Sequence, residues 1–448
     1  MQDLACDRDE NRDRQVLLQR ASSHSWAALD GYHFDVKDEG ALRSLGCRIL
    51  SIDDSGARTH AASDLVLNQN LSAESAVYQR GPDTIRLDGP RYVLLRRAFR
   101  EGLRNLRERR TGGILVMFGG SDPAGLTART LSAFAKLKEP PPAGVAICGP
   151  LDTDGENVRK AAAKLGEGWS VEMNASDGAV SAAQSNAELA VAACGSTIWE
   201  LAAFGVPTLA LSVAENQTPV LSSLAAIGVV ADAGPGSSFR EDELGARFDL
   251  FRRGADELRR MSQLGPAMVD GEGASRVVDA MLALEGSTEP RIRAAGNHDA
   301  FLLWRWANDP ATRAQSFQTG PIEWDDHRRW LAQRLGSEAC RIYILEWKTV
   351  PVGVVRYDRL EGFLARVSFS VDRDFRGRGF GLKLIEMSRP VASRDLSVDV
   401  FEAETLPGNV PSRRVFRRAG FFEQPSAGGD ARRIRFLFGP RRNQGLGA

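Results

Sequence analysis

The feature that most constrains the fold is a strand–turn–helix–strand pattern near the middle of the chain. An apolar run at Leu189–Ala193 has the length of a buried strand, and it is followed by Gly195-Ser196-Thr197. A helix is expected to begin there, because Ser and Thr are good helix caps, and to end at Gly205 and Pro207. A second apolar strand follows at Thr208–Leu211. Two buried strands joined by one helix predict a parallel α/β sheet.

The turn in this pattern has the properties of an anion site. Free backbone N–H groups and the positive end of the helix dipole both point at whatever lies beside Gly195, Ser196 and Thr197. Glu200 lies one helical turn further along, where a carboxylate can accept hydrogen bonds from two sugar hydroxyls. These features predict a site for a nucleotide-sugar diphosphate, with amides for phosphate and an acid for ribose. An ordinary capped helix is an equally good interpretation of the turn alone.

Composition excludes several classes of function. The 448 residues include 58 basic and 58 acidic ones, so the electrostatic argument for a nucleic-acid or anionic-membrane partner is removed. The five cysteines are scattered, without metal-type spacing, which indicates a reducing compartment and no disulfide framework. The sequence has neither a bilayer-length apolar run nor a secretory signal, so a cytoplasmic protein is expected.

The amino-terminal part predicts a charged tail and a small α/β domain. Residues 1–25 are dense in charges of both signs and are expected to be poorly ordered. Residues 26–105 show a βαβ rhythm with polar residues after the strands. The three strands expected there are Trp26–Leu29, Arg48–Ile52 and Leu65–Leu67.

Residues 106–285 alternate strands and helices more regularly and predict a second domain of the same class. The first strand, Ile114–Phe118, leads into Gly119-Gly120-Ser121, which repeats the chemistry of Gly195-Ser196-Thr197. Two amide-lined turns at the carboxyl ends of strands in one sheet favour a phosphate ligand more than either turn alone.

The composition changes after residue 286. Residues 286–296 are polar and are expected to form a linker, whereas residues 297–440 hold five of the eight tryptophans. There an alternating strand, Arg366–Val371, leads into Arg376-Gly377-Arg378-Gly379-Phe380-Gly381 ahead of a helix. The glycines let the backbone wrap closely around a bulky anion, and Arg376 and Arg378 add charge. The stretch predicts a pyrophosphate cradle; a basic, glycine-rich turn without a ligand is the alternative.

This part of the chain resembles the GNAT family of acyl-CoA N-acetyltransferases, from about Ile292 to Phe438. Arg376-x-x-Gly379-x-Gly381 matches the acetyl-CoA pyrophosphate motif of that family, and Asn409 and Ser412 match its later cofactor-side segment. The resemblance implies a mixed α/β domain whose two central strands splay apart around the thioester. It also implies acetyl-CoA as co-substrate, direct attack by an amine, and no metal.

Such a reaction needs a base for the substrate ammonium and a proton donor for the leaving thiolate. Glu404, five residues before Asn409, is the candidate base, although a solvated carboxylate at a strand end is the alternative. Ser368 and Ser370 are weaker candidates for lining the site. Many members of the family carry a tyrosine as the acid at the position of Phe416, which cannot donate a proton.

The earlier part of the chain resembles the UDP-sugar hydrolase of pseudaminic acid biosynthesis. The matching residues are Asp30-x-Tyr32, Asp53-Asp54, Asp64–Asn70, Phe118–Asp122 with Gly119, Gly120 and Ser121, Gly195-Ser196-Thr197-x-x-Glu200, Glu215-Asn216-Gln217 and Asp270–Arg276. The resemblance implies a GT-B pair of Rossmann-type domains with a UDP-linked amino sugar in the cleft. It assigns the glycine turns, Glu200, Asn216 and Gln217 to binding and places Tyr32 in the cleft of the hydrolase.

The implied reaction is release of UDP from UDP-2,4-diacetamido-2,4,6-trideoxy-β-L-altropyranose by water. In that pathway a GNAT enzyme first acetylates the 4-amino group, so the two halves are expected to catalyse consecutive steps on one nucleotide sugar. The family's Gly-x-Gly-His-x-x-Arg loop, which carries the catalytic histidine, has no match here. We therefore expect an incomplete GT-B pair, truncated in its first domain, that binds the UDP-sugar but hydrolyses it poorly, with His33 as a weak substitute.

Several interpretations stay open. The chain is either a bifunctional hydrolase and acetyltransferase, or a single-activity acetyltransferase with a non-catalytic module that binds UDP-sugar. A glycosyltransferase in place of the hydrolase is a third interpretation, because the UDP-binding half is shared. The acetyltransferase could also act on a protein amino terminus or an antibiotic, since the cofactor motif does not depend on the acceptor.

Overall fold

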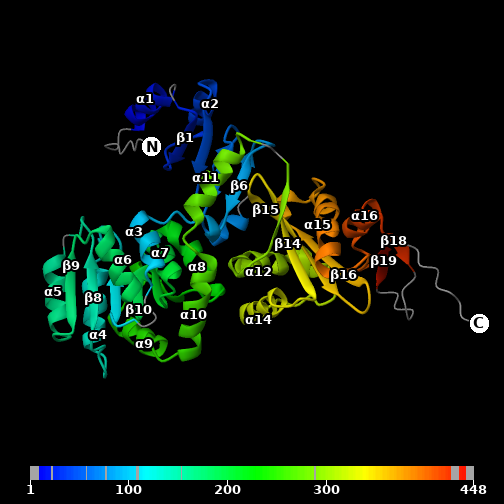
Figure 1. Cartoon of the computed structure of the whole chain (residues 1–448). Coiled ribbons are helices and arrows are strands. Elements are labelled where there is room, and N and C mark those ends of the chain that lie inside the picture. Colours follow the sequence, from blue (N-terminus) through cyan, green and yellow to red (C-terminus); the bar gives the residue numbers. More distant parts are fainter. Residues whose placement is uncertain are drawn as a thin grey trace, which may run out of the picture. The chain divides into compact units, whose positions relative to one another are not determined.

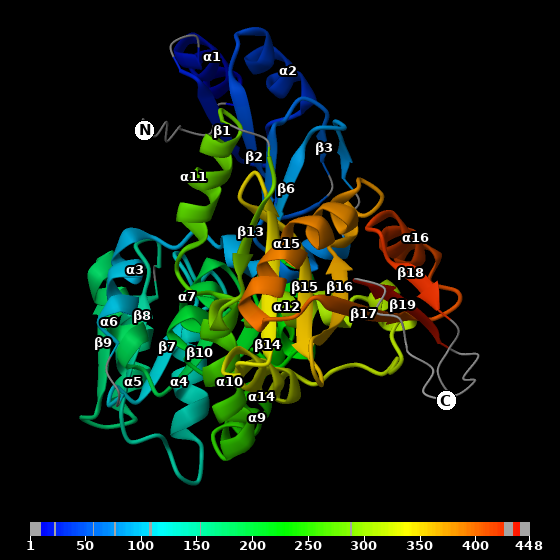
Figure 2. The same cartoon turned by 45° about the vertical axis from the view of Figure 1, so that its right-hand side comes forward.

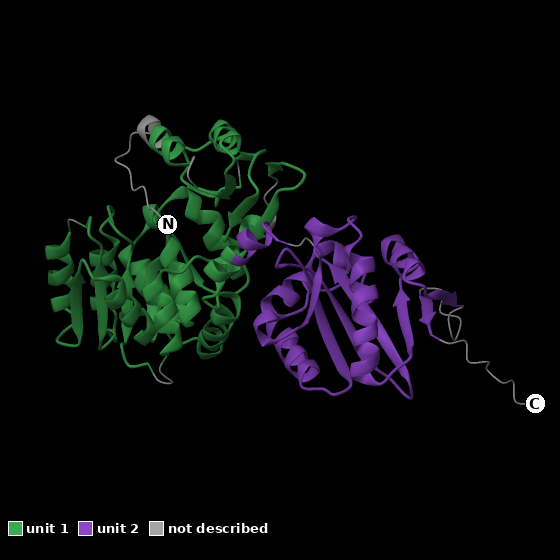
Figure 3. Ribbon diagram, turned by 45° about the horizontal axis from the view of Figure 1, so that its top comes forward, with its two compact units in different colours: residues 1–278 green, residues 279–448 purple. Residues whose placement is uncertain are grey.

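The structure is a computed structural model. It describes residues 10–21, 24–56, 58–75, 78–106, 110–152, 154–286, 289–424 and 433–439. The chain divides into two compact units, residues 1–278 and residues 279–448 (Figure 3). Both units combine helices with sheets, so the chain is a mixed α/β protein, as the sequence predicts.

The first unit begins with a four-stranded parallel sheet in the order β1-β2-β4-β6 (Figure 1). Its strands are β1 (Trp26–Asp30), β2 (Arg48–Ile52), β4 (Leu65–Asn68) and β6 (Ile85–Asp88). A separate two-stranded ladder joins β3 (Thr59–His60) to β5 (Gln79–Arg80). The sequence analysis missed β6 because it carries Arg86, which is buried and donates to the carbonyl of Ala73.

The structure corrects the expectation of a poorly ordered amino-terminal segment. Residues 1–9, 22 and 23 lie outside the described residues, but Glu10–Ala21 forms the helix α1. Leu17 and Leu18 of α1 pack on an apolar cluster beside β1 and α2 (Val36–Ser44). Packing on this cluster orders a segment whose local charge pattern predicts little structure.

The second sheet of the first unit has six parallel strands in the order β12-β11-β10-β7-β8-β9. They are β7 (Ile114–Met117), β8 (Gly144–Cys148), β9 (Trp169–Met173), β10 (Leu189–Ala193), β11 (Thr208–Ser212) and β12 (Ala231–Pro235). The order reverses between β7 and β10, which are neighbours in the sheet. In open α/β sheets, ligands bind outside the carboxyl ends of the strands at such a switch point.

Helices that connect these strands form two packed groups. One group contains α4 (Leu126–Ala135), α5 (Gly155–Ala163) and α9 (Glu241–Phe251). The other contains α3 (Arg97–Arg104), α6 (Asp177–Asn186), α7 (Ser196–Phe204) and α10 (Ala255–Met268). Two further helices are α8 (Thr218–Ala226) and α11 (Gly273–Ala283).

The second unit contains a seven-stranded sheet in the order β13-β14-β15-β16-β17-β19-β18. Its strands are β13 (Arg291–Ala294), β14 (Cys340–Trp347), β15 (Val350–Arg359), β16 (Leu364–Val371), β17 (Val400–Thr405), β18 (Phe422–Gln424) and β19 (Ile434–Phe438). β16 and β17 run parallel, and the other neighbours pair antiparallel.

Helices lie on both faces of this sheet. They are α12 (Ala300–Asn308), α13 (Pro310–Ala314), α14 (Trp324–Leu335), α15 (Phe380–Leu396) and α16 (Val410–Arg418) (Figure 2). On β15, the hydroxyl of Tyr357 meets Ser388 of α15, whereas the adjacent Arg356 lies over Trp330 of α14. Since neighbouring residues of a strand point to opposite faces, α15 and α14 cover different faces.

Two expectations for this unit need correction. The linker expected at residues 286–296 contains β13, whose Arg293 forms ion pairs with Asp299 and Glu346. The apolar residues of Leu396–Ala403 predict a strand over that range, but α15 extends to Leu396 and β17 runs from Val400 to Thr405. Ser397 ends the helix with φ +54°, a left-handed conformation that is uncommon for serine.

The described residues also bear on membrane spans and cysteines. None of their helices is both long enough and apolar enough to cross a bilayer. Cys47, Cys148, Cys194 and Cys340 are buried free thiols, and Cys6 lies outside the described residues.

Candidate functional site

The two glycine turns of the first unit follow β7 and β10, the neighbouring strands at the switch point. After β7, Gly119 has φ +88°, and the carbonyl of Gly120 accepts from the amide of Leu151 at 2.9 Å. A Cβ at Gly149 would stand 2.4 Å from Gly120, so the two backbones are in direct contact. Gly119, Gly120 and the exposed Ser121 thus form a bare turn at the carboxyl end of the sheet.

Asp122, directly after this turn, closes it onto α4. Its carboxylate accepts from the amides of Leu126 (2.9 Å) and Thr127 (2.7 Å) at the start of the helix. Burial raises the pKa of Asp122, although the hydrogen bonds from Thr127 oppose the rise. This carboxylate fixes the turn in place.

The turn after β10 leaves the start of α7 uncapped by a side chain. Gly195 is the N-cap residue, Ser196 is exposed and Thr197 is buried. Gln217, in the short helix η3 (Glu215–Gln217), lies against this turn: a Cβ at Gly195 would stand 3.4 Å from its Nε2. The structure therefore brings together Gly195, Ser196 and Gln217, which the sequence analysis assigned to one site.

Glu200 of α7 is buried and already holds hydrogen-bond donors in the described structure. Arg96 donates to Oε1 from Nε (3.2 Å) and Nη2 (2.8 Å), and Gln184 donates to Oε2 at 3.1 Å. Burial raises the pKa of Glu200, and the bonds from Arg96 and Gln184 only partly offset this effect. Sequence analysis missed Arg96, which lies in the connection between the two sheets.

Tyr32 and Asn216 connect the loops of the two sheets. The amide Nδ2 of Asn216 donates to the Tyr32 hydroxyl at 3.2 Å, and that hydroxyl donates to Asp54 at 2.9 Å. Tyr32 is 66% exposed. The tyrosine therefore lies in the solvent-exposed link between the loops that follow β1 and β11.

The histidines of the first unit differ in access. His33 is half-buried beside Tyr32 and stacks on Phe34. His60 is 1% exposed, with Nδ1 2.7 Å from Glu39 and Nε2 3.0 Å from Asp53. Burial alone would lower the pKa of His60, but its bonds to Asp53 and Glu39 more than offset this effect and raise the pKa above its ordinary value.

The glycine-rich stretch of the second unit lies between β16 and α15. Gly377 (φ +77°) and Gly379 (φ +86°) adopt left-handed conformations, and no described atom lies within 4 Å of where their Cβ atoms would stand. Gly381 lies against Phe369 and Val415, with a Cβ position 3.1 Å and 3.3 Å from them. The first two glycines line open space, while the third packs α15 on the sheet.

The arginines of this stretch differ. Arg376 is tied back into the fold, because it donates to the carbonyl of Val371 at 3.0 Å and to Asp309 at 2.7 Å. Arg378 is exposed and lies over the ring of Phe375. Arg378 is therefore better placed than Arg376 to meet an anion at the turn.

β16 and β17 part from each other beside this stretch. Their parallel pairing runs from Leu364–Val400 to Arg366–Glu402 and ends there, although β16 continues to Val371 and β17 to Thr405. Ser368 and Ser370 lie on the diverging part of β16 and are cross-strand neighbours of Arg356 and Val354 on β15. A wedge with unpaired backbone groups thus opens between the two strands.

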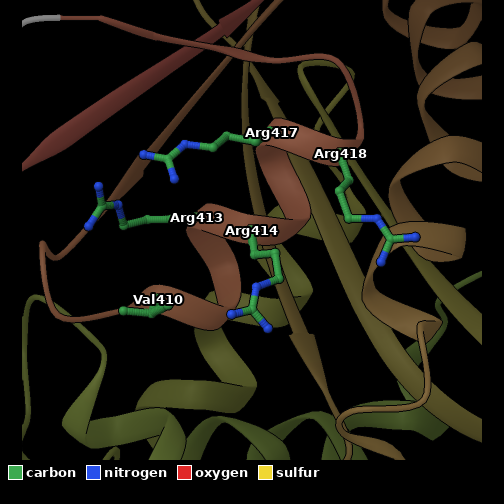
Figure 4. A pocket seen from close by; sticks show the side chains of 5 residues that line it. All are labelled: Val410, Arg413, Arg414, Arg417 and Arg418. Carbon is green, nitrogen blue, oxygen red and sulfur yellow. The ribbon is translucent and has the colours of Figure 1, made fainter.

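Helix α16 supplies charge near this wedge. Asn409 is its N-cap and accepts from the amide of Ser412 at 3.2 Å. A cavity of about 370 Å³ is lined by Val410, Arg413, Arg414, Arg417 and Arg418 (Figure 4).

These arginines extend in two directions. Arg413 and Arg417 point to one side of α16 and pair with Glu423 (Figure 4). Arg414 and Arg418 point to the other side and form no ion pair with any described residue (Figure 4). Sequence analysis missed both, although their i, i+4 spacing on an otherwise paired basic helix is a usable signal.

Glu404, the candidate base, is the penultimate residue of β17. Its Oε2 accepts from Arg433 at 2.9 Å, and its cross-strand neighbour is Arg435 of β19. Phe416, at the position of the missing tyrosine, is buried against Phe369 and other rings. The packing explains this phenylalanine as part of the core under α16.

No group of three or more histidine, cysteine, aspartate or glutamate side chains within the described ranges is arranged to hold a metal ion.

Comparisons with known proteins agree with this architecture. Residues 291–422 match the family model described as acetyltransferase (GNAT) domain. The second unit thus contains a GNAT acetyltransferase domain.

Two relatives match about half or most of the chain. The spore coat polysaccharide biosynthesis protein SpsG of Bacillus subtilis is 26% identical over 233 residues, covering 51% of this chain and 68% of SpsG. An uncharacterized protein of Methanocaldococcus jannaschii, MJ1062, is 19% identical over 399 residues, covering 85% of this chain and 78% of that protein.

A crystal structure of aminoglycoside acetyltransferase AAC(6')-Ib in complex with coenzyme A is also similar. It is 17% identical with a TM-score of 0.30, and the match covers 34% of this chain and 95% of that chain.

Proposed function

We propose that the second unit transfers the acetyl group of acetyl-CoA to the primary amine of an amino sugar. The observation that carries this proposal is the wedge between β16 and β17, which opens beside the turn at Gly377 and Gly379 and has Glu404 on β17. The free strand edges offer amide partners for the pantetheine arm of the co-substrate.

The proposed chemistry has one displacement. Glu404 takes a proton from the substrate ammonium, the amine nitrogen attacks the thioester carbonyl, and the carbon–sulfur bond breaks. The attacking nitrogen releases its second proton to solvent and the CoA thiolate takes up a proton, so the products are an N-acetylated sugar and CoA. Since Phe416 has no proton to give, we assign that last transfer to water.

The phosphates of acetyl-CoA are assigned to the basic groups around the wedge. The amides at Gly377 and Gly379 start α15 and suit the pyrophosphate, and Arg378 adds charge. Arg414 and Arg418 are available on α16 for a further phosphate.

For the first unit we propose binding of a UDP-linked amino sugar, in a GT-B-like arrangement. The turns at Gly119–Ser121 and Gly195–Thr197 adjoin at the switch point and suit a diphosphate, and Glu200 suits the ribose hydroxyls. The similarity to SpsG, named for polysaccharide biosynthesis, supports a role in sugar metabolism.

A second candidate for this unit is hydrolysis of UDP-2,4-diacetamido-2,4,6-trideoxy-β-L-altropyranose, the pseudaminic acid pathway step. His60 does not suit the base, because it is sealed between Glu39 and Asp53. The observation that favours this candidate is the location of His33 next to Tyr32, in the exposed link between the loops that follow β1 and β11.

One experiment tests both units of the full chain. The purified protein is incubated with acetyl-CoA and a UDP-linked 4-amino sugar, and CoA thiol, acetylated sugar and free UDP are each measured. We expect acetylated sugar, with Glu404→Gln lowering kcat by about 100-fold, the order of a lost general base. Glu338→Gln, an exposed glutamate before β14, is the control. Absence of N-acetylated product would contradict the transferase proposal, and rapid UDP release would replace binding by hydrolysis.

A further inference from the structure

The candidate base of the second unit has a cation bound to it within the chain. Arg433, directly before β19, donates from Nη1 to Oε2 of Glu404 at 2.9 Å. The guanidinium of Arg433 also lies over the ring of Phe317, with its carbon 4.3 Å from the ring centroid. One positive charge therefore lies between a carboxylate and the face of an aromatic ring, both of which attract an organic cation.

Phe317 is held in this position by its neighbours along the chain. It lies in the connection between α13 and α14. Arg313 of α13 donates to Oγ of Ser316 at 3.0 Å and to the carbonyl of Gln318 at 3.2 Å, so the connection is tied on both sides of the ring. The ring itself is 47% exposed. An exposed phenylalanine on a fixed connection adds little to the core but presents an aromatic face to a ligand.

Glu404 lies on the face of the sheet opposite α15. On β17, Phe401 contacts Tyr357, which bonds to Ser388 of α15. Successive residues of a strand point to opposite faces, so Glu404, three residues after Phe401, points away from α15 and toward Phe317. It also lies beyond the last β16–β17 pair. The carboxylate and the ring therefore border the wedge to which the acetyl group is assigned.

The other arginines near Glu404 are bound to a different carboxylate. Arg435, its cross-strand neighbour, and Arg366 of β16 both donate to Glu402, at 2.6 Å and 2.7 Å. Arg433 is thus the cation that pairs with Glu404 in the described part of the chain, and its side chain is 44% exposed. Water screens such a half-exposed ion pair, which contributes little to stability, so a ligand can displace this guanidinium at small cost.

We propose that Glu404 and Phe317 form the site for the protonated amine of the acceptor, and that Arg433 occupies this site until the acceptor displaces it. The inference rests on the proposed function of the second unit, in which Glu404 takes a proton from the substrate ammonium. It adds Phe317 as a residue that binds the ammonium and Arg433 as a competitor within the chain.

Acetylation itself then empties the site. An ammonium group carries the charge that the carboxylate and the ring both bind, whereas the acetamide formed from it is neutral. The reaction therefore removes both attractions from the product. The guanidinium of Arg433 stays charged at physiological pH and returns to Glu404. This exchange favours release of the acetylated product over its renewed binding.

The first test replaces the ring. The full chain is given acetyl-CoA and the UDP-linked 4-amino sugar, and initial rates of CoA release give kcat and both KM values. Phe317→Leu should raise KM for the amino sugar about 5-fold, the order of one partly exposed cation–π contact, and leave KM for acetyl-CoA unchanged. Phe317→Tyr keeps the ring and should retain the wild-type KM. The matched control is Phe363→Leu, in the turn between β15 and β16, which should change neither KM.

Removal of the competing cation should act in the opposite direction. Arg433→Gln should lower KM for the amino sugar about 3-fold, because an exposed ion pair competes only weakly. The matched control is Arg329→Gln, whose exposed pair with Asp326 lies within α14 and whose loss should leave KM unchanged. In the Arg433→Gln background, Phe317→Leu should still raise KM, because the ring contacts the ammonium itself. If Phe317 only supported Arg433, its replacement would lower KM in the otherwise wild-type chain and have no effect in this background. Either result would overturn the inference.

A measurement on the wild-type protein needs no variant. Propylguanidinium carries the same cation as Arg433 and should inhibit competitively against the amino sugar but not against acetyl-CoA. Propylurea, an uncharged molecule of nearly the same shape, should not inhibit at the same concentration. Equal inhibition by both compounds, or by neither, would overturn the inference while leaving the transferase intact. Absence of acetyl transfer would instead overturn the proposed function and the inference with it.

Discussion

Two buried charge clusters in this molecule have the same arrangement with the chemical types exchanged: a central group lies between two partners of the opposite type. In the second unit the carboxylate of Glu402 lies between the guanidinium groups of Arg366 and Arg435. In the first unit the imidazole of His60 lies between the carboxylates of Glu39 and Asp53. In the first cluster two guanidinium groups share one carboxylate, whereas in the second two carboxylates share one imidazole, and Asp53 also lies 3.7 Å from the guanidinium of Arg58.

The difference in exposure separates their roles. Glu39, His60 and Asp53 are each at most 3% exposed in their side chains, so no ligand can reach them. The arginines around Glu402 extend into solvent on one side. A cluster that is buried on all sides affects only the stability of the fold. A cluster whose arginines are partly exposed can also bind a ligand. Burial of the outer partners therefore decides whether a charged cluster can be a site.

The largest effect is expected when the partly exposed cluster loses its central carboxylate. Glu402→Gln leaves Arg366 and Arg435 close together without a carboxylate between them. We expect the free energy of unfolding of the second unit to fall by about 3 kcal/mol, the lower part of the range for a broken buried pair, because both arginines stay partly in water. Urea titration followed by hydrogen exchange in peptides of β16 and β17 measures this loss.

Glu423→Gln is the matched control, because Glu423 also accepts from two arginines, Arg413 and Arg417, but at the surface. Its stability loss should stay below about 1 kcal/mol. Equal losses for the two variants would show that burial of Glu402 does not matter and would break the comparison.

The fully buried cluster around His60 makes the stability of the first unit depend on pH. The raised pKa of His60 means that its contribution is complete below the ordinary value of 6.5 and is lost as the pH rises through the value in the folded protein. Burial would raise the pKa values of Glu39 and Asp53, but their bonds to His60 lower both, so their contributions are lost only in acid. We expect maximal stability between about pH 4.5 and 6.5 and a fall toward pH 9, measured by urea titration across pH.

His60→Gln removes the titrating group. It should cost about 2 kcal/mol at pH 6, the typical penalty for buried acceptors that lose a charged donor, and should flatten the fall toward pH 9. A wild-type profile that stays flat from pH 6 to pH 9 would contradict a raised pKa of His60 in the folded protein.

Glu200 extends the comparison with Glu402. It is also a buried carboxylate, but it accepts hydrogen bonds from one arginine and one glutamine, whereas Glu402 accepts from two arginines. Glu200→Gln keeps the packing but removes the charge that we assign to the ribose hydroxyls. UDP binding to the full chain should weaken about 10-fold, which isothermal titration measures. The matched control is Glu172→Gln, on β9 away from the switch point, which should leave the affinity for UDP unchanged. Gln184→Glu does not serve as a control, because it adds a charge.

The smallest effect is expected at the exposed link between the two sheets of the first unit. Asn216→Ala removes the hydrogen bond to the Tyr32 hydroxyl, and we expect less than about 0.5 kcal/mol of lost stability because both groups return to water. The same titrations detect this loss. A loss above 1 kcal/mol would show that the link fixes the two sheets relative to each other.

Local features of the molecule could be predicted from the sequence. The turns at Gly119–Ser121 and Gly195–Thr197 lie where their residues predict them. The sequence also predicts a hairpin about Lys348-Thr349, and β14 and β15 form it. In these cases a few consecutive residues determine the backbone, through glycine conformations, caps and strand alternation. The alternation of strands and helices along the sequence likewise predicts the parallel sheets of the first unit.

Long-range partners could not be predicted. Arg96 and Glu200 are 104 residues apart, and Arg366, Glu402 and Arg435 come from three different strands. No single stretch encodes such pairs, because only the register between distant strands brings them together. The start of β17 was misplaced for a related reason: Ser397 ends α15 in a conformation that a glycine would have signalled.

The parting of β16 and β17 has a thermodynamic consequence. Beyond Arg366–Glu402 the sheet has two inner edges whose amide and carbonyl groups face no neighbouring strand of the pair. A bound molecule with amide groups of its own can pair with these free amide and carbonyl groups, as an additional strand would. With acetyl-CoA bound at the proposed site, the antiparallel strands on one side and β17–β19 on the other would be coupled through the ligand, and the binding free energy would add to the stability of the second unit.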